Sequence, residues 1–183
     1  MRYSLLLPLR PLASRFTLLL SAGMAVSVSA STLIMNAVII DGSGAPPEQG
    51  SVRISDSRIV AKGDLIPLDT DTVIDAAGYV LAPGFIDTHS HADALILSQR
   101  EALPKVTQGI TTVIVGQDGE SPYPLSGFFA ALGQRPAKIN VAAFAGHNTL
   151  RNEVMHHDAN RSANEAEVGA MQVLLQSELA AGA

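Results

Sequence analysis

The sequence predicts an α/β protein in which a small β unit precedes strands that alternate with helices. Between residues 31 and 82, short apolar and β-branched runs are separated by turn residues, which is typical of a β unit. After Pro83-Gly84 the pattern changes, and strand-like runs alternate with stretches of helical periodicity. The composition, with 47% hydrophobic and 16% charged residues, excludes a disordered chain. The absence of cysteine excludes a disulfide scaffold and a cysteine-based zinc site.

Residues 1–30 have the features of a secretory signal peptide. They contain arginines but no acidic residue, and this basic part leads into the largely apolar run Phe16–Val28. Ala30 then occupies the last position of a small-residue cleavage site, directly before Ser31. A membrane anchor is the alternative, but the apolar run is far shorter than the ~20 residues of a spanning helix. We therefore expect an exported protein, periplasmic or secreted, with no stable membrane insertion after cleavage.

The segment 31–82 is predicted to form short strands and tight turns. Leu33–Ile40 is the first strand, because it is apolar and ends at residues that favour turns. Ser51–Ser55 and Arg58–Val60 alternate apolar and polar residues, which predicts a hairpin. A second hairpin is expected between Val73-Ile74 and Tyr79–Leu81. The unit is expected to be mostly antiparallel.

The segment 83–183 is predicted to contain three β-α units in succession. Such units imply parallel strands joined by right-handed crossovers. In the last helix, Asn164 and Glu167 have the spacing of a capping box, and an apolar stripe follows them. The expected strands are Phe85–His89, Thr111–Val115 and Ile139–Phe144, and the expected helical stretches before the last are Ala94–Val106 and Pro122–Leu132.

The length of the chain limits the architecture. Eight β-α units close a barrel in about 250 residues, whereas this sequence has 183 residues and three such units. The chain ends near Gly182, where a helix would lead into a further strand. We interpret the sequence as a truncated piece of a larger protein; a complete three-unit α/β domain is the alternative.

A His-x-His motif is the sharpest chemical signal. In a strand, alternate side chains share a face, so His89 and His91 would point the same way with Cα atoms about 6–7 Å apart. Two imidazoles on one face can converge on a metal ion, and nitrogen and oxygen ligands favour zinc or a similar divalent ion. Asp87 shares that face one step deeper. A lone motif of this kind is often structural, but here it closes an apolar strand after a Pro-Gly turn.

Two further positions are candidates for the same site. Asp118 follows the second strand, at the end where barrel enzymes place their active sites. A plain turn aspartate before Gly119 is the alternative. His147 follows the third strand and could line the site and contact substrate, although a capping or loop histidine fits it as well. His156-His157 is interpreted as an exposed polar loop.

Several stretches resemble a known family. Gly84–His91 resembles the first-strand metal motif of the amidohydrolase superfamily. Leu103–Val113 and Gly146–Arg151 are similar to the N-acyl-D-amino-acid deacylase (D-aminoacylase) branch, and Asp41–Pro47 resembles the opening β segment of that branch. The resemblance spans nearly all of residues 33–183.

The resemblance implies a fold and a domain division. Residues 31–82 would form the first part of a split β-sandwich, and residues 83–183 would form the first three βα units of a (β/α)8 TIM-like barrel. By the same resemblance, His89 and His91 match the first-strand metal ligands. Asp118 falls where many D-aminoacylases have a cysteine ligand, and a carboxylate is a harder ligand than a thiolate.

The resemblance also implies an activity. Members of the branch hydrolyse the amide bond of N-acyl-D-amino acids with a divalent metal, zinc above all, and release a carboxylate and a free D-amino acid. The partner would be a small N-acyl amino acid, and the net charge of -5 argues against a nucleic acid. The remaining ligands and the proton-shuttling aspartate are expected beyond residue 183. Residues 31–183 alone are therefore expected to be inactive.

The sequence is also compatible with two other interpretations. Another amidohydrolase, such as a dihydroorotase-like cyclic amidase, would share His89 and His91 but not Leu103–Val113 or Gly146–Arg151. The other rival is a non-catalytic truncated remnant that keeps only the first third of the fold.

The first prediction concerns export. Because a basic segment without acids precedes an apolar core and a small-residue site, we expect cleavage after Ala30. N-terminal sequencing of the exported protein should begin at Ser31. Exported protein that retains Met1 would refute the signal peptide.

Overall fold

The computed structural model describes residues 30–158 and 160–183. The predicted signal peptide therefore lies outside the described residues, except for Ala30. The chain divides into two compact units: residues 30–37 with Gln49–Gly78, and Val38–Glu48 with Tyr79–Ala183. Within the described residues, no helix is long and apolar enough to cross a membrane.

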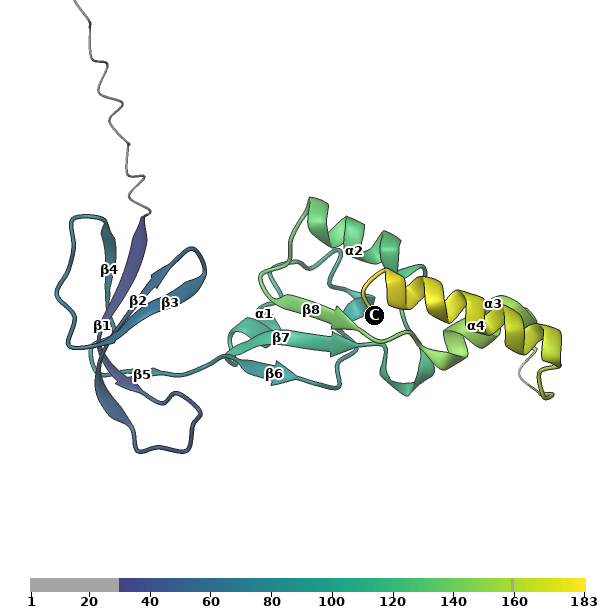
Figure 1. Cartoon of the computed structure of the whole chain (residues 1–183), viewed down its shortest axis with the longest axis horizontal. Coiled ribbons are helices and arrows are strands. Elements are labelled where there is room, and N and C mark those ends of the chain that lie inside the picture. Colours follow the sequence, from purple (N-terminus) through teal and green to yellow (C-terminus); the bar gives the residue numbers. More distant parts are fainter. Residues whose placement is uncertain (1–29, 159) are drawn as a thin grey trace, which may run out of the picture. The chain divides into compact units, whose positions relative to one another are not determined.

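A β-sheet forms most of the N-terminal part of the chain (Figure 1). Its strands are β1 (Ser31–Ile39), β2 (Glu48–Ser55), β3 (Arg58–Gly63) and β4 (Asp71–Asp75), in the order β3-β2-β1-β4. The predicted hairpin is confirmed, because β2 and β3 pair antiparallel. Asp56 and Ser57 form its turn with φ of 48° and 61°, a left-handed conformation that short polar residues tolerate.

The second predicted hairpin is wrong. β4 and β5 (Val80–Leu81) do not pair with each other, and both run parallel to β1. The turn between them is bonded to β1 instead, because Ala76 N donates to Met35 O at 2.8 Å and Gly78 N donates to Asn36 O at 2.8 Å. The Asn36 side chain also donates to Asp75. A turn-rich stretch therefore serves here as a connection between two parallel pairings.

Asp71 is the polar centre of this β unit. Its carboxylate has no exposed surface, and it accepts hydrogen bonds from the Arg53 guanidinium, the Ser31 hydroxyl and Leu68 N. A buried carboxylate is tolerated only when it is paired and hydrogen-bonded. The bond from Arg53, followed by that from Ser31, holds the pKa of Asp71 well below its ordinary value.

The C-terminal part of the chain is α/β, as predicted. β6 (Phe85–Asp87), β7 (Ile110–Val115) and β8 (Asn140–Ala143) form a parallel sheet in the order β6-β7-β8. The helices are α1 (Leu103–Val106), α2 (Leu125–Gln134), α3 (His147–Met155) and α4 (Glu165–Ala180), with short 3-10 turns at Ala92–Ala94 (η1) and Gln117–Gly119 (η2). Figure 1 shows β6, β7 and β8 side by side.

One face of the parallel sheet packs against α2. Val113 and Val115 from β7 are fully buried, and they belong to one cluster with Leu125 and Phe128 from α2 and Ala143 from β8. Burial of large apolar side chains such as these stabilises a fold by roughly 1.5–3 kcal/mol each.

Two helical predictions need correction. The expected helix Ala94–Val106 is broken into η1 and α1, because Ala102 has a left-handed φ of 46° and Pro104 follows it closely. Helix α3 was not predicted, since polar residues dominate its sequence. The capping box of α4 is confirmed, with Glu167 N donating to Asn164 and Asn164 N donating to Glu167.

The predicted apolar stripe of α4 is largely exposed. Val168 and Leu179 have exposed fractions of 44% and 54%. The buried residue of this helix is Glu178, whose carboxylate accepts a hydrogen bond from Leu125 N at the start of α2. A carboxylate at a helix N-terminus accepts a hydrogen bond from a backbone N–H that has no partner within the helix, and its negative charge interacts favourably with the helix dipole.

Asp71 provides a test of the β unit. Asp71→Asn should lower the urea midpoint of unfolding at neutral pH, because it leaves the Arg53 charge without its partner. A carboxyl with a lowered folded pKa stabilises above its unfolded pKa, so the difference from wild type should shrink as pH falls below 3.8. Unfolding followed by circular dichroism measures both effects. The exposed neighbour variant Asp69→Asn is the control, and equal midpoints for the two variants would contradict the assignment.

Candidate metal centre

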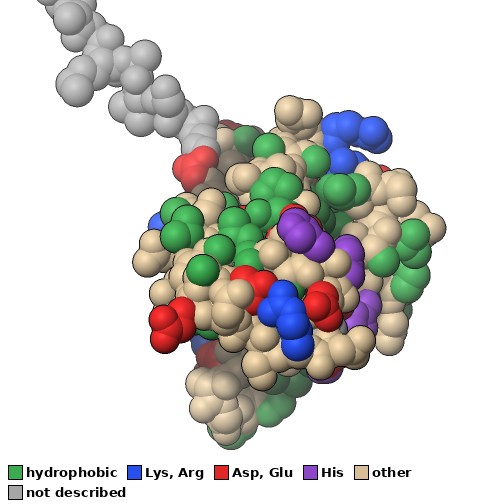
Figure 2. Space-filling view, turned by 90° about the vertical axis from the view of Figure 1, so that its right-hand side faces the viewer, with side chains coloured by type: hydrophobic (Ala, Val, Ile, Leu, Met, Phe, Trp, Pro, Cys, Tyr) green, Lys and Arg blue, Asp and Glu red, His purple; other side chains and the backbone are tan. Residues whose placement is uncertain are grey.

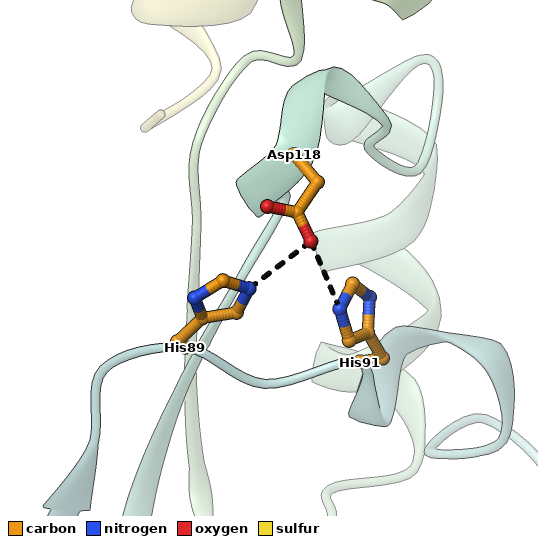
Figure 3. Close-up of side chains that lie close together, drawn as sticks. All are labelled: His89, His91 and Asp118. Carbon is orange, nitrogen blue, oxygen red and sulfur yellow. Dashed lines mark hydrogen bonds and ion pairs between the residues drawn. The ribbon is translucent and has the colours of Figure 1, made fainter.

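The candidate site lies in two loops at the carboxyl ends of β6 and β7. β6 ends at Asp87, two residues earlier than the predicted strand, so His89 and His91 lie beyond it. His89 occupies a bend, and His91 immediately precedes η1. The strand parity predicted for the pair therefore does not position them. Their loop does, and it still turns both imidazoles towards the same point (Figure 3).

Asp118 meets both histidines. One carboxylate oxygen, Oδ2, lies 3.1 Å from His89 Nε2 and 3.3 Å from His91 Nε2. The two imidazole rings have centroids 5.6 Å apart. All three side chains are exposed, by 58%, 69% and 62% for His89, His91 and Asp118. The structure thus brings together the three residues that the sequence singled out as metal ligands.

The geometry fits a single divalent ion. One donor atom from each of the three residues lies within 4.8 Å of the others. Ligand atoms at about 2.0–2.1 Å from zinc in tetrahedral geometry are about 3.3 Å apart. The two nitrogen–oxygen distances of 3.1 and 3.3 Å match that separation. Imidazole and carboxylate are also the ligand types that zinc takes in hydrolytic sites.

A left-handed turn directs Asp118. Asp118 has φ 62°, and it lies between Gly116 at 86° and Gly119 at 89°. Glycine adopts such angles without strain, and aspartate tolerates them better than most residues. Strand parity does not position Asp118, because the chain leaves β7 after Val115. The turn nevertheless brings the carboxylate to the histidines.

Hydrogen bonds join the two loops independently of any ion. Gln117 Nε2 donates to Thr88 O at 2.6 Å, which links the residue before Asp118 to the residue before His89. Ser90 N donates to Ile114 O at 3.0 Å. The first bond thus joins the two ligand-bearing loops, and the second joins the histidine loop to β7.

A second interaction fixes the end of β6. Lys105 Nζ donates to Asp87 Oδ2 at 2.6 Å, and both side chains are mostly buried. This hydrogen bond, the main cause, holds the pKa of the Asp87 carboxyl below its ordinary value. The Asp87 carboxylate therefore carries a negative charge that pairs with Lys105 at the end of β6. Its other oxygen, Oδ1, accepts a hydrogen bond from His89 N at 3.4 Å.

His147 does not join the group. It is exposed at the first position of α3, and the three-residue cluster found among the described residues leaves it out. His156 and His157 are exposed at the end of α3, as expected. Figure 2 shows histidine side chains at the surface of the face that it presents.

Several supporting residues were missed from the sequence. Gln117, Lys105 and Thr149 contribute contacts that hold the loops, but none belongs to a ligand motif. The available signal was the pair of glycines around Gln117-Asp118, which indicates a constrained turn rather than a plain loop.

The chain is similar in sequence to a known family and to several characterised proteins. The model of the amidohydrolase family matches residues 72–182. N-acyl-D-aspartate deacylase of Alcaligenes xylosoxydans xylosoxydans is 42% identical over 174 residues, covering 82% of this chain and 35% of that protein. D-aminoacylase of the same organism is 36% identical over 174 residues, covering 82% and 36%.

A solved structure is also similar. N-acyl-D-glutamate deacylase from Bordetella bronchiseptica, in complex with zinc and a phosphonate inhibitor that mimics the tetrahedral intermediate, superposes with a TM-score of 0.76. Its sequence identity is 35%, and the match covers 84% of this chain and 37% of that chain. The chain spans about a third of the length of the curated relatives it matches, at 35% and 36%. The family match over more than half of the sequence shows that this chain belongs to the amidohydrolase family.

Proposed function

We propose that this chain contributes the first part of the active site of a zinc-dependent N-acyl-D-amino-acid deacylase. The observation that carries the proposal is the convergence of His89, His91 and Asp118 at the carboxyl end of parallel strands. Proteins similar to this chain deacylate N-acyl-D-aspartate and N-acyl-D-glutamate, which selects the substrate class.

His89, His91 and Asp118 would hold the ion. A bound zinc ion would lower the pKa of a water molecule towards about 7 and polarise the scissile carbonyl. The imidazoles supply neutral nitrogen ligands, and the Asp118 carboxylate supplies a negative charge. Asp87 and Lys105 keep the end of β6 in place, and the exposure of all three ligands leaves the site open to substrate.

We also propose that the parallel sheet is the beginning of a (β/α)8 barrel beside a split β-sandwich. β6 and β8 are the outer strands of the described sheet, and Phe85 and Ile86 on β6 are 67% and 60% exposed. Unpaired strand edges with exposed apolar side chains invite association, so they are normally covered in a native protein. Further barrel strands would cover them, and further helices would cover the exposed apolar side chains of α4.

The proposal includes an exported, periplasmic or secreted enzyme that takes a small N-acyl amino acid. Support for export comes from the basic and apolar character of residues 1–30. Support against a nucleic-acid partner comes from the net charge of -5.

Asp118 gives the sharpest test of the metal centre. In the full-length gene product, Asp118→Ala removes a ligand and a negative charge from the ion. Loss of a residue that only supports a metal ligand typically lowers metal affinity about 10- to 100-fold. Because Asp118 would bind the ion directly, we expect the zinc affinity of Asp118→Ala to fall further than that. Asp118→Cys should recover much of the affinity, because a thiolate is itself a good zinc ligand. Chelator competition measures the affinities.

The matched control is Asp64→Ala, which removes an exposed aspartate from the β unit. It should leave zinc affinity unchanged. If Asp118→Ala keeps full metal content and near-normal turnover, Asp118 is only a turn residue and the ion is held without it.

The activity is tested with enantiomeric substrates. The full-length gene product should release D-aspartate or D-glutamate from the N-acetyl derivatives and should leave the L-enantiomers intact. Activity should be lost after chelation and return with zinc, and His89→Ala should be inactive because a ligand is missing.

The same assay separates the rivals. Hydrolysis of dihydroorotate or a hydantoin in place of the N-acyl-D-amino acids would indicate a cyclic amidase. Zinc binding without hydrolysis of either class would indicate a remnant without catalysis.

A further inference from the structure

We infer that Thr149, in the first turn of α3 directly after β8, is a positioning residue for Asp118. The inference rests on the proposed metal role of Asp118. It also gives a function to the Gly146–Arg151 stretch, whose histidine the structure leaves outside the metal cluster. The turn after β8 supports the neighbouring turn that presents the carboxylate.

The Thr149 hydroxyl forms hydrogen bonds with the backbone of Ser121, three residues beyond Asp118. Its Oγ1 accepts a hydrogen bond from Ser121 N at 2.9 Å and lies 3.3 Å from Ser121 O, to which it can donate. Thr149 is 8% exposed, and both of its hydrogen bonds to Ser121 are partly buried. A buried backbone donor that loses its partner carries the full cost of desolvation.

A further hydrogen bond joins the start of α3 to the Ser121 side chain. Gly146 N donates to Ser121 Oγ at 3.0 Å, so Ser121 is held through its backbone by Thr149 and through its side chain by Gly146. Asn148 Nδ2 also reaches the backbone oxygen of Asp118 itself, at 3.4 Å. These contacts join the first turn of α3 to the turn that presents the ligand.

Close backbone packing completes the support. A Cβ atom at residue 146 would collide with the carbonyl oxygen of Gly119, and one at residue 119 would collide with the side chain of Asn148. The two turns are therefore in direct contact, with no room between them for a side chain.

The turn needs such support because of its backbone conformation. Asp118 has φ 62° although it is not a glycine, whereas Gly116 and Gly119 adopt their positive φ angles without strain. A non-glycine residue in this region persists where its surroundings over-determine it. Without the contacts to Ser121, the turn could relax, and Asp118 would leave the point on which both imidazoles converge.

The test compares two substitutions at one position in the full-length gene product. Thr149→Val keeps the shape and removes the oxygen, whereas Thr149→Ser keeps the oxygen. We expect Thr149→Val to weaken zinc binding about 10- to 100-fold, as for other supports of metal ligands, and Thr149→Ser to restore most of it. Cobalt-substituted Thr149→Val should show an altered visible absorption spectrum, whereas cobalt-substituted Thr149→Ser should keep the wild-type spectrum.

Thr107→Val is the matched control. The Thr107 hydroxyl donates to Leu103 O within its own helical turn, so its loss should change neither zinc affinity nor the cobalt spectrum. Ser121→Ala provides a second variant if Thr149→Val does not fold, because it removes the acceptor of Gly146 N and leaves Thr149 intact. It should weaken zinc binding in the same direction.

Wild-type zinc affinity and an unchanged cobalt spectrum in Thr149→Val, or in Ser121→Ala where that variant is used, would overturn the inference. Equal losses in Thr149→Val and Thr149→Ser would also overturn it, since the hydroxyl would then not be the cause. The measurement uses zinc alone. A protein that binds zinc but does not hydrolyse N-acyl-D-amino acids would therefore disprove the proposed function and leave this inference standing.

Discussion

Parallel pairing of β6 with β7 is the constraint on which the candidate site depends. In a parallel pair the carboxyl ends of both strands lie at the same edge, so the loops that follow them are neighbours. Val113 pairs with Asp87 in this register, and the ligands follow each strand within a few residues. A hairpin would instead place successive loops at opposite ends. The convergence of the three candidate ligands is thus a consequence of the β-α-β connection, which the alternation of strand and helix patterns already indicated.

The grouping of the three candidate ligands could be predicted from the sequence, but the backbone that brings them together could not. His89, His91 and Asp118 were identified from an apolar strand, a Pro-Gly turn and a position after the next strand. Parity along a strand was the wrong reason for their convergence, since β6 ends at Asp87 and β7 ends at Val115. Local pattern does not show where a strand gives way to a turn, because this depends on hydrogen bonds to distant segments, such as those from Gln117 to Thr88 and from Ser90 to Ile114.

The other differences have a related cause. The hairpin expected after Ile74 requires its turn to close on itself, yet Ala76 and Gly78 donate to β1. Helix α3 has few apolar residues, so its periodicity is weak, although Leu150 and Met155 are buried. In both places a contact from a segment distant in the sequence overrides the local preference. The single hairpin and the capping box, which depend on residues next to each other, were predicted correctly.

The support of the ligands also bears on how the site binds an ion. Binding is weakened when loops must be ordered at the moment of association, and preorganisation removes that cost. Here the Gln117–Thr88 hydrogen bond joins the two loops, and the Ser90–Ile114 bond joins the histidine loop to β7. The Lys105–Asp87 pair holds the end of β6, and none of these contacts requires an ion. The histidine and aspartate side chains themselves remain exposed, so they stay accessible to an ion and a substrate. A backbone held in place beneath exposed candidate ligands is compatible with an ion site that is open to substrate, and residues that support metal ligands from outside commonly matter for metal affinity.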